Sequence, residues 1–191
     1  MMTKQLKQFL VCGASTGGKS TFATELVKKY HIQHVQIDPI IEGFEDVFPQ
    51  LGITHNALTH KKHLEVCEKF CPFLCRMIDG LDSFDFVIEG FRMPLKELHD
   101  RYGHTHSIIT FGYPHTTPAQ KLQECREFDT ENWTNDCTDD ELLKIFEFLI
   151  QESIFQQQEC LKLNIPFFDT GNDYWAKINE ALALVGEKYG K

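Results

Sequence analysis

The segment from Gly13 to Ser20 constrains the fold of this chain more than any other. It reads GASTGGKS, with three glycines in six positions followed at once by a lysine and a serine. An apolar run, QFLVC at 8–12, comes directly before it, and a helical pattern from Ser20 to Tyr30 follows it. A buried strand, a glycine-rich turn and a helix in immediate succession are typical of a parallel α/β fold.

The same segment predicts a phosphate-binding loop, because it matches G-x-x-x-x-G-K-[ST] at every fixed position. Such a loop wraps an anion with inward-pointing backbone N–H groups, and the positive end of the following helix faces the same anion. Lys19 adds a mobile charge, and the Ser20 hydroxyl is placed to ligate Mg²⁺. A chance lysine after a glycine turn is the alternative, which the flanking strand and helix disfavour. The residues expected to bind the phosphates are Gly13, Ala14, Ser15, Thr16, Gly17, Gly18, Lys19, Ser20 and Thr21.

Alternating strands and helices continue along the whole chain. The apolar runs expected to be buried strands are 8–12, 34–38, 84–90, 106–113 and 165–170. The segments with helical patterns are 20–30, 58–78, 139–163 and 174–188. Pro72 is expected to kink or break the second helix, and Thr138 is a suitable N-cap for the third. The sequence therefore predicts an α/β three-layer sandwich with a parallel sheet, forming a single domain over residues 1–191.

Charge and cysteine content exclude several classes of partner. The net charge of −9 argues against binding a nucleic-acid polymer or an anionic membrane, since both require a basic surface. No stretch reaches the roughly 18 apolar residues of a membrane span. The seven cysteines are an odd number, and the first residues do not form a signal-peptide pattern. We therefore expect reduced thiols and a cytoplasmic location.

Two acidic residues end predicted strands, where parallel sheets place their ligands. Glu89 ends FDFVIEG and is expected to hold Mg²⁺ through water, although an acid that caps the next helix is the alternative. Asp38 ends HVQID and precedes Pro39. It is expected to take a proton from an attacking hydroxyl or to help hold the metal, whereas a turn-initiating Asp-Pro pair is the alternative.

These features together resemble the small P-loop kinases, the P-loop NTPase group of adenylate, nucleoside and shikimate kinases. The run from Ile88 to Arg92 is similar to the acid-Gly-Phe-Pro-Arg turn of adenylate kinases, without its proline. The resemblance implies a five-stranded sheet of order 2-3-1-4-5, an acceptor-binding helical segment at about 40–80 and a lid at about 112–138. It also implies that Arg92 contacts a phosphate and that the loop holding Thr170 and Gly171 packs against adenine.

The segment from Gly112 to Asp136 is polar, and we expect a mobile lid there rather than packed core. Its cationic residues are Lys121 and Arg126, although adenylate kinases line their lids with several arginines to hold two phosphorylated substrates. The whole chain holds four arginines: Arg76, Arg92, Arg101 and Arg126. Because arginine favours bidentate phosphate recognition, this scarcity slightly favours an acceptor that bears a hydroxyl.

The predicted activity is an ATP:acceptor phosphotransferase that uses ATP, Mg²⁺ and a small-molecule acceptor such as a hydroxyl-bearing metabolite or nucleoside. The predicted catalytic residues are Lys19, Asp38, Arg92 and Arg126, and the predicted metal-binding residues are Ser20 and Glu89. A nucleoside monophosphate kinase and a non-catalytic nucleotide-binding protein are the alternatives. A regulatory GTPase is disfavoured, because the Asn-Lys-x-Asp pattern that reads guanine is absent from the sequence.

Other conspicuous residues are expected to be structural. One face of the second predicted helix carries His60, His63, Cys67, Cys71 and Cys75. These residue types ligate zinc, but one straight helix cannot wrap four ligands around an ion, so packing on a core face is expected. The lid segment also holds zinc-ligating residue types, namely His115, Cys125 and Cys137. The paired CxxC spacing of zinc-bearing lids is absent, so a zinc site is not expected there either. Trp133 has two open interpretations, stacking on a base or anchoring the lid.

Overall fold

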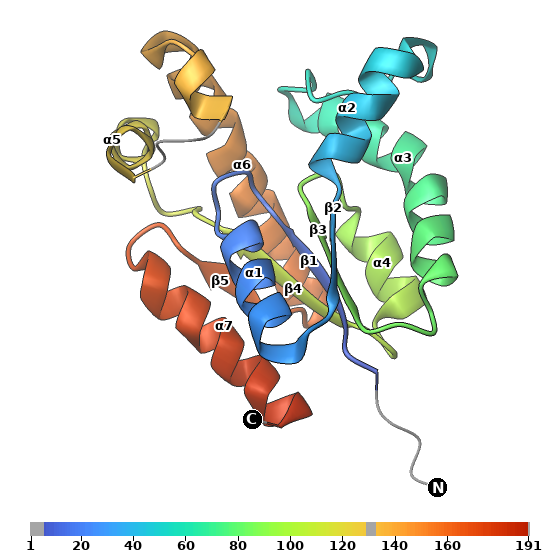
Figure 1. The fold of residues 1–191 in the computed structure, drawn as a ribbon. Coiled ribbons are helices and arrows are strands. Elements are labelled where there is room, and N and C mark those ends of the chain that lie inside the picture. The colour runs from blue at the N-terminus through green and yellow to red at the C-terminus, as the bar shows by residue number, and fades with distance from the viewer. Residues whose placement is uncertain (1–5, 129–132, 191) are drawn as a thin grey trace, which may run out of the picture.

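The computed structural model describes residues 6–128 and 133–190. Its strands are β1 (Gln8–Gly13), β2 (Gln33–Gln36), β3 (Phe86–Gly90), β4 (Ser107–Gly112) and β5 (Phe167–Asp169). They form a parallel sheet of order β2-β3-β1-β4-β5 (Figure 1). This order confirms the arrangement that the resemblance to small P-loop kinases implied.

Helices cover both faces of the sheet (Figure 1). They are α1 (Lys19–Tyr30), α2 (Asp38–Val47), α3 (His60–Gly80), α4 (Leu95–Tyr102), α5 (Pro118–Phe128), α6 (Asp139–Leu163) and α7 (Tyr174–Tyr189), with short 3₁₀ helices at Pro49–Leu51 and Trp133–Asp136. The described residues contain no helix that is both long and apolar enough to cross a membrane.

The central strand β1 divides the core into two layers. Phe9 and Val11 pack with α1 and α7, whereas Leu10 and Cys12 pack with α3, α4 and α6. All four side chains are fully buried, which explains why the run QFLVC is continuously apolar rather than alternating. Because all five strands are parallel, their carboxyl ends lie at one edge of the sheet, together with the glycine loop.

Two short helices, α4 and α5, were not predicted from the sequence, and α2 falls largely within the segment at about 40–80 that was expected to be helical without separate bounds. Strand β2 ends at Gln36, and Asp38 is the first residue of α2 rather than the last residue of a strand. Pro39 explains the difference, because proline fits the first turn of a helix and lacks only an N–H that would be unpaired there.

Pro72 was expected to kink or break the second predicted helix, but α3 runs from His60 to Gly80 through it. The Pro72 side chain is exposed. The proline lies on the solvent side of the helix, where water can satisfy the carbonyl that it leaves unpaired.

The segment expected to form the lid contains α5, which Figure 1 shows at the carboxyl edge of the sheet, across from α2. A third apolar cluster lies beneath α5 and includes Cys125, Tyr113 and Phe146. Part of this segment is therefore packed against α6, contrary to the expectation that it lies outside the core. Residues 129–132 of the segment lie outside the described residues.

Candidate active site

The loop after β1 has a backbone shape that glycine alone allows. Gly13 has φ of +134°, and a Cβ atom there would lie 1.9 Å from the carbonyl oxygen of Phe111. The N–H of Ala14 donates to that same oxygen over 3.1 Å, so the loop starts in contact with β4. Gly18, with φ of +103°, is the N-cap of α1, and the loop thus leads directly into the positive end of that helix.

Neighbouring strands hold the loop in place from behind. The hydroxyl of Tyr113, just after β4, donates to the Ser15 carbonyl over 2.8 Å. The hydroxyl of Thr170, just after β5, donates to the Gly17 carbonyl over 3.0 Å. Thr170 therefore lies against the phosphate loop.

Lys19 and Ser20 are the first two residues of α1, and they lie beside the carboxyl end of β3. The ammonium group of Lys19 donates to the Ala14 carbonyl over 2.9 Å, which keeps it folded over the loop. The Ser20 hydroxyl donates to Glu89 Oε1 over 2.8 Å. The structure thus brings together the hydroxyl and the carboxylate that the sequence assigned to the metal.

Glu89 is a buried residue, with 3% of its surface exposed. Burial alone would raise its pKa, but His34, the Lys19 charge and the Ser20 hydroxyl together lower it, with His34 Nε2 lying 3.6 Å from Oε1. An anionic carboxylate beside a hydroxyl supplies the hard oxygen donors that Mg²⁺ prefers, so this pair fits the expected ion.

Asp38 begins α2 beside the end of β3. Its carboxylate oxygen Oδ1 is buried and has no hydrogen-bond partner among the residues that the structure describes. A buried polar atom without a partner is costly, and such atoms mark positions where a ligand can complete the bonding. Asp38 thus has an acceptor oxygen to offer to a bound molecule.

Arg92 is almost fully buried, with 2% exposed, and lies over the Phe91 ring at 4.8 Å. Its terminal nitrogens are engaged by protein atoms, since Nη1 donates to His63 Nδ1 and Nη2 donates to the His55 carbonyl over 3.0 Å. Burial lowers the pKa of Arg92, while Cys67 and Asp38 act in the opposite direction. Its charge is therefore near Asp38, and each terminal nitrogen has one protein acceptor, whereas its Nε has no hydrogen-bond partner among the described residues.

The structure does not bring Arg126 to the phosphate loop. Its guanidinium donates to Asp139 Oδ1 at 2.9 and 3.0 Å, to the Thr134 carbonyl at 2.9 Å and to the Cys137 carbonyl at 2.7 Å. These contacts join α5 to the start of α6. Lys121, one turn earlier on α5, lies with its ammonium group 4.6 Å from the centroid of the Tyr113 ring and 3.1 Å from Glu124 Oε2.

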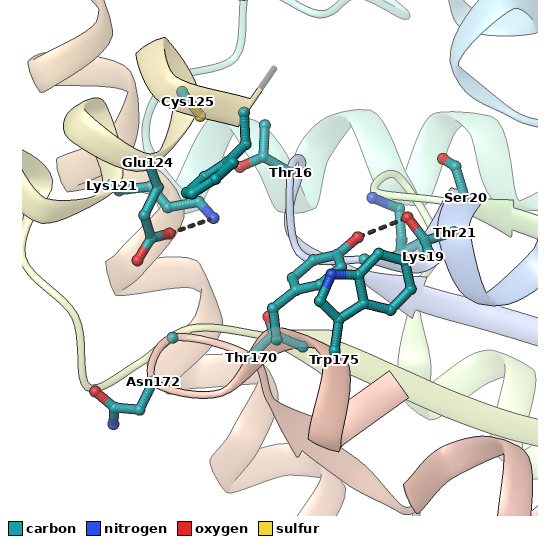
Figure 2. A pocket seen from close by; sticks show the side chains of 14 residues that line it. Thr16, Lys19, Ser20, Thr21, Lys121, Glu124, Cys125, Thr170, Asn172 and Trp175 are labelled. Atoms are coloured by element: carbon teal, nitrogen blue, oxygen red, sulfur yellow. Dashed lines mark hydrogen bonds and ion pairs between the residues drawn. The ribbon is translucent and has the colours of Figure 1, made fainter. Parts of the chain in front are cut away.

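A cavity of about 710 Å³ lies beside the loop (Figure 2). Its lining residues are Thr16, Gly18, Lys19, Ser20, Thr21, Lys121, Glu124, Cys125, Phe128, Thr170, Gly171, Asn172, Tyr174 and Trp175. Figure 2 shows Lys121 and Glu124 on one side and Trp175 on the other. The cavity is large enough for a nucleotide. The loop that follows β5 and the phosphate loop both line it.

Comparison with known proteins yields similarity at the level of structure. No protein-family model matches the sequence, and no curated protein matches it. The structure is similar to a gluconokinase from Sinorhizobium meliloti 1021, with a TM-score of 0.60 and 13% identity over 98% of this chain and 95% of that one. It is also similar to a shikimate kinase from Bacteroides thetaiotaomicron, with a TM-score of 0.54 and 18% identity over 95% and 97% of the two chains. A shikimate kinase from Acinetobacter baumannii, solved in complex with shikimate, has a TM-score of 0.54 and 13% identity over 98% and 97%.

The chain has the fold of the small P-loop kinases. This confirms the resemblance that the phosphate loop and the turn around Glu89 indicated.

Several residues of this P-loop kinase fold line the site but were not assigned to it from the sequence. Tyr174 bonds Thr21 through hydroxyl oxygens 2.6 Å apart, and Trp175 lines the cavity beside it. Lys121 was noted as a lid cation but given no role. The position of Tyr174 and Trp175, directly after the loop that carries Thr170, is the sequence signal that would have indicated them.

The histidine and cysteine row on α3 forms structural contacts within the P-loop kinase fold. His60 Nδ1 lies 2.9 Å from Oε1 of the buried Glu152 on α6, and His63 Nε2 lies 3.5 Å from Cys67 Sγ. Burial, the Arg92 charge and His60 lower the pKa of His63 to about 3, so this ring is neutral and accepts the bond from Arg92. Trp133 is 39% exposed in the short helix that Arg126 contacts through Thr134.

Proposed function

We propose that this protein is an ATP-dependent kinase that transfers the γ-phosphoryl group to a hydroxyl group of a small molecule. The observation that carries the proposal is the direct Ser20–Glu89 hydrogen bond beside Lys19, at the end of a phosphate loop that opens on a nucleotide-sized cavity. A phosphate loop alone would suit any nucleotide-binding protein. The added pair of oxygen donors suits an enzyme that positions a metal on the phosphates.

On the nucleotide side, the N–H groups of residues 13–20 and the start of α1 would bind the phosphates. Lys19 would exchange its bond with the Ala14 carbonyl for a phosphate oxygen, since its flexible stem allows the move. Ser20 and Glu89 would hold Mg²⁺, with Glu89 acting through water. When bound, Mg²⁺ neutralises charge on the phosphates, and the protein contributes positioning and electrostatic stabilisation.

On the acceptor side, Asp38 would orient the hydroxyl and accept its proton through the unpaired Oδ1. Asp38 is the first residue of α2, and α3 follows α2 in the chain. These two helices make up most of the segment at about 40–80 that we expect to bind the acceptor. The similar structures named gluconokinase and shikimate kinase, one of them holding shikimate, support a small-molecule acceptor.

The arginines favour a hydroxyl over a phosphate as the accepting group. The terminal nitrogens of Arg92 and Arg126 donate to protein atoms, and Arg101 is paired with Asp79. Arg76 is exposed one turn before the end of α3, and that end leads into the start of β3, away from the carboxyl edge where Asp38 lies. A nucleoside monophosphate acceptor would need at least one free guanidinium fork for its phosphate. Lys121, rather than Arg126, is placed to supply lid charge to the transferred group.

The test is ADP formation from ATP and Mg²⁺ with a panel of sugars, polyols, hydroxy acids and nucleosides, beside a second panel of nucleoside monophosphates. We expect stimulation by a member of the first panel and none by the second. Stimulation by a monophosphate would establish the alternative monophosphate kinase. ATP binding with no stimulation by either panel would favour a non-catalytic nucleotide-binding protein.

A further inference from the structure

Two large aromatic side chains line the nucleotide cavity and remain mostly exposed. Trp175 on α7 is 63% exposed, and Phe128 at the end of α5 is 74% exposed. They belong to helices on different sides of the cavity. Single exposed aromatic side chains are common on protein surfaces, but these two line a concave site, where their flat apolar faces are accessible to a ligand.

Trp175 contacts the residue before it, Tyr174, which packs beside the phosphate loop. Its ring packs edge to face on Tyr174, with centroids 5.5 Å apart and planes at 84°. The Tyr174 hydroxyl is 2.6 Å from Thr21 Oγ1 on α1, and a Cβ at Gly18 would lie 3.3 Å from the Tyr174 ring. The indole therefore contacts a tyrosine that is itself bonded to the first turn of α1.

Two backbone donors of the loop after β5 are already bonded within the protein. The Thr170 N–H donates to the Gly112 carbonyl over 2.8 Å, and the Gly171 N–H donates to Asp169 Oδ1 over 3.0 Å. The other Asp169 oxygen lies 2.6 Å from His115 Nδ1. Neither N–H is therefore available to a ring nitrogen of a base, which removes two obvious means of telling one purine from another.

We propose, on the basis of the proposed function, that the base of the nucleoside triphosphate is held by stacking on the indole of Trp175 rather than read through its hydrogen-bonding edge. Phe128 provides apolar surface from the lid side of the same cavity. Stacking binds any base, because every base has a π-face. The protein should therefore accept both ATP and GTP as phosphoryl donors.

The experiment is calorimetry of ATP, GTP and inorganic tripolyphosphate with Mg²⁺, on the wild type and on Trp175→Ala. We expect wild-type affinities for ATP and GTP that agree within about 10-fold. Trp175→Ala should weaken both nucleotides by roughly 10- to 100-fold and leave tripolyphosphate unchanged, because tripolyphosphate has no base to stack. Trp175→Phe should retain most of the affinity. Phe84→Ala, at an exposed aromatic residue that does not line the cavity, is the control and should show no loss.

Each failure has a separate meaning. Unchanged ATP affinity in Trp175→Ala, or a preference of more than about 100-fold for one purine in the wild type, overturns the stacking proposal and leaves the kinase proposal intact. Equal loss of ATP and tripolyphosphate in Trp175→Ala also overturns it, since the indole would then support the phosphate loop. Binding of neither ATP nor tripolyphosphate by the folded wild type removes the proposed function itself.

Discussion

At the scale of single residues, the buried Oδ1 of Asp38 has no hydrogen-bond partner among the described residues. If this oxygen accepts the proton of the acceptor, Asp38→Asn should lower acceptor-stimulated ADP formation by roughly 100-fold or more, because an amide is no base. The affinity for ATP, measured by calorimetry, should stay near that of the wild type, since Asp38 does not line the nucleotide cavity.

The matched control is Asp46→Asn, an exposed aspartate on the same helix. It should leave both turnover and ATP affinity unaltered. Wild-type turnover in Asp38→Asn would remove the base from the mechanism and leave Asp38 as a helix-start residue.

At the scale of elements, helix α5 presents two cations in different ways. Lys121 lines the nucleotide cavity, whereas Arg126 bonds to Asp139 and to two carbonyls near the start of α6. We expect Lys121→Met to lower acceptor-stimulated turnover by roughly 10- to 1,000-fold with little change in the midpoint of urea unfolding, because it removes charge stabilisation from the transferred group.

Arg126→Ala should show the reverse pattern. It should lower the free energy of unfolding by about 1 kcal/mol, a modest value because the pair with Asp139 is partly exposed and screened by solvent. Loss of turnover in Arg126→Ala without loss of stability would restore the direct role that the sequence suggested for this arginine.

Elements with a strong local pattern were predictable from the sequence, and short ones were not. The long helices α6 and α7 carry extended apolar patterns, and the strands β1 and β3 hold unbroken apolar runs, whereas β2 reads QHVQ. By contrast, the buried residues of α5 are Lys121 and Cys125, so this helix has no apolar stripe to detect. The burial of a lysine is decided by how α5 packs on α6 and over Tyr113, which are contacts between distant parts of the chain.

The same limit applies to the site. The phosphate loop and Glu89 followed from patterns within a few residues, and the structure places Glu89 beside Ser20 as expected. The contacts of Arg92 and Arg126 could not be predicted, because their partners come from other elements. For these two residues, the residue type was visible in the sequence but the geometry was not.

At the scale of the whole molecule, a buried polar network joins the helices that flank the site. His63 accepts a hydrogen bond from Arg92, lies 3.5 Å from Cys67 Sγ and 3.9 Å from Glu152 Oε2, and is near His60 on the same helix. Burial, together with the Arg92 and His60 charges, lowers the pKa of His63 from 6.5 to about 3. The folded state therefore keeps this ring neutral in a range where the unfolded chain protonates it.

The sign of the pH effect follows from linkage. Above pH 6.5 the ring is neutral in both states, and below it the unfolded chain binds a proton that the folded chain does not, so stability falls as the pH drops toward 3. Between about pH 7 and pH 5 this one group should remove about 2 kcal/mol from the free energy of unfolding.

His63→Gln keeps an acceptor for Arg92 but does not titrate, so its loss of stability over that pH range, measured by urea unfolding, should be smaller by this amount. The exposed His104 gives the control, since His104→Gln should lose as much stability as the wild type. Parallel losses in all three proteins would show that His63 carries a proton in the folded state, and that Arg92 is then held by the His55 carbonyl rather than by the ring.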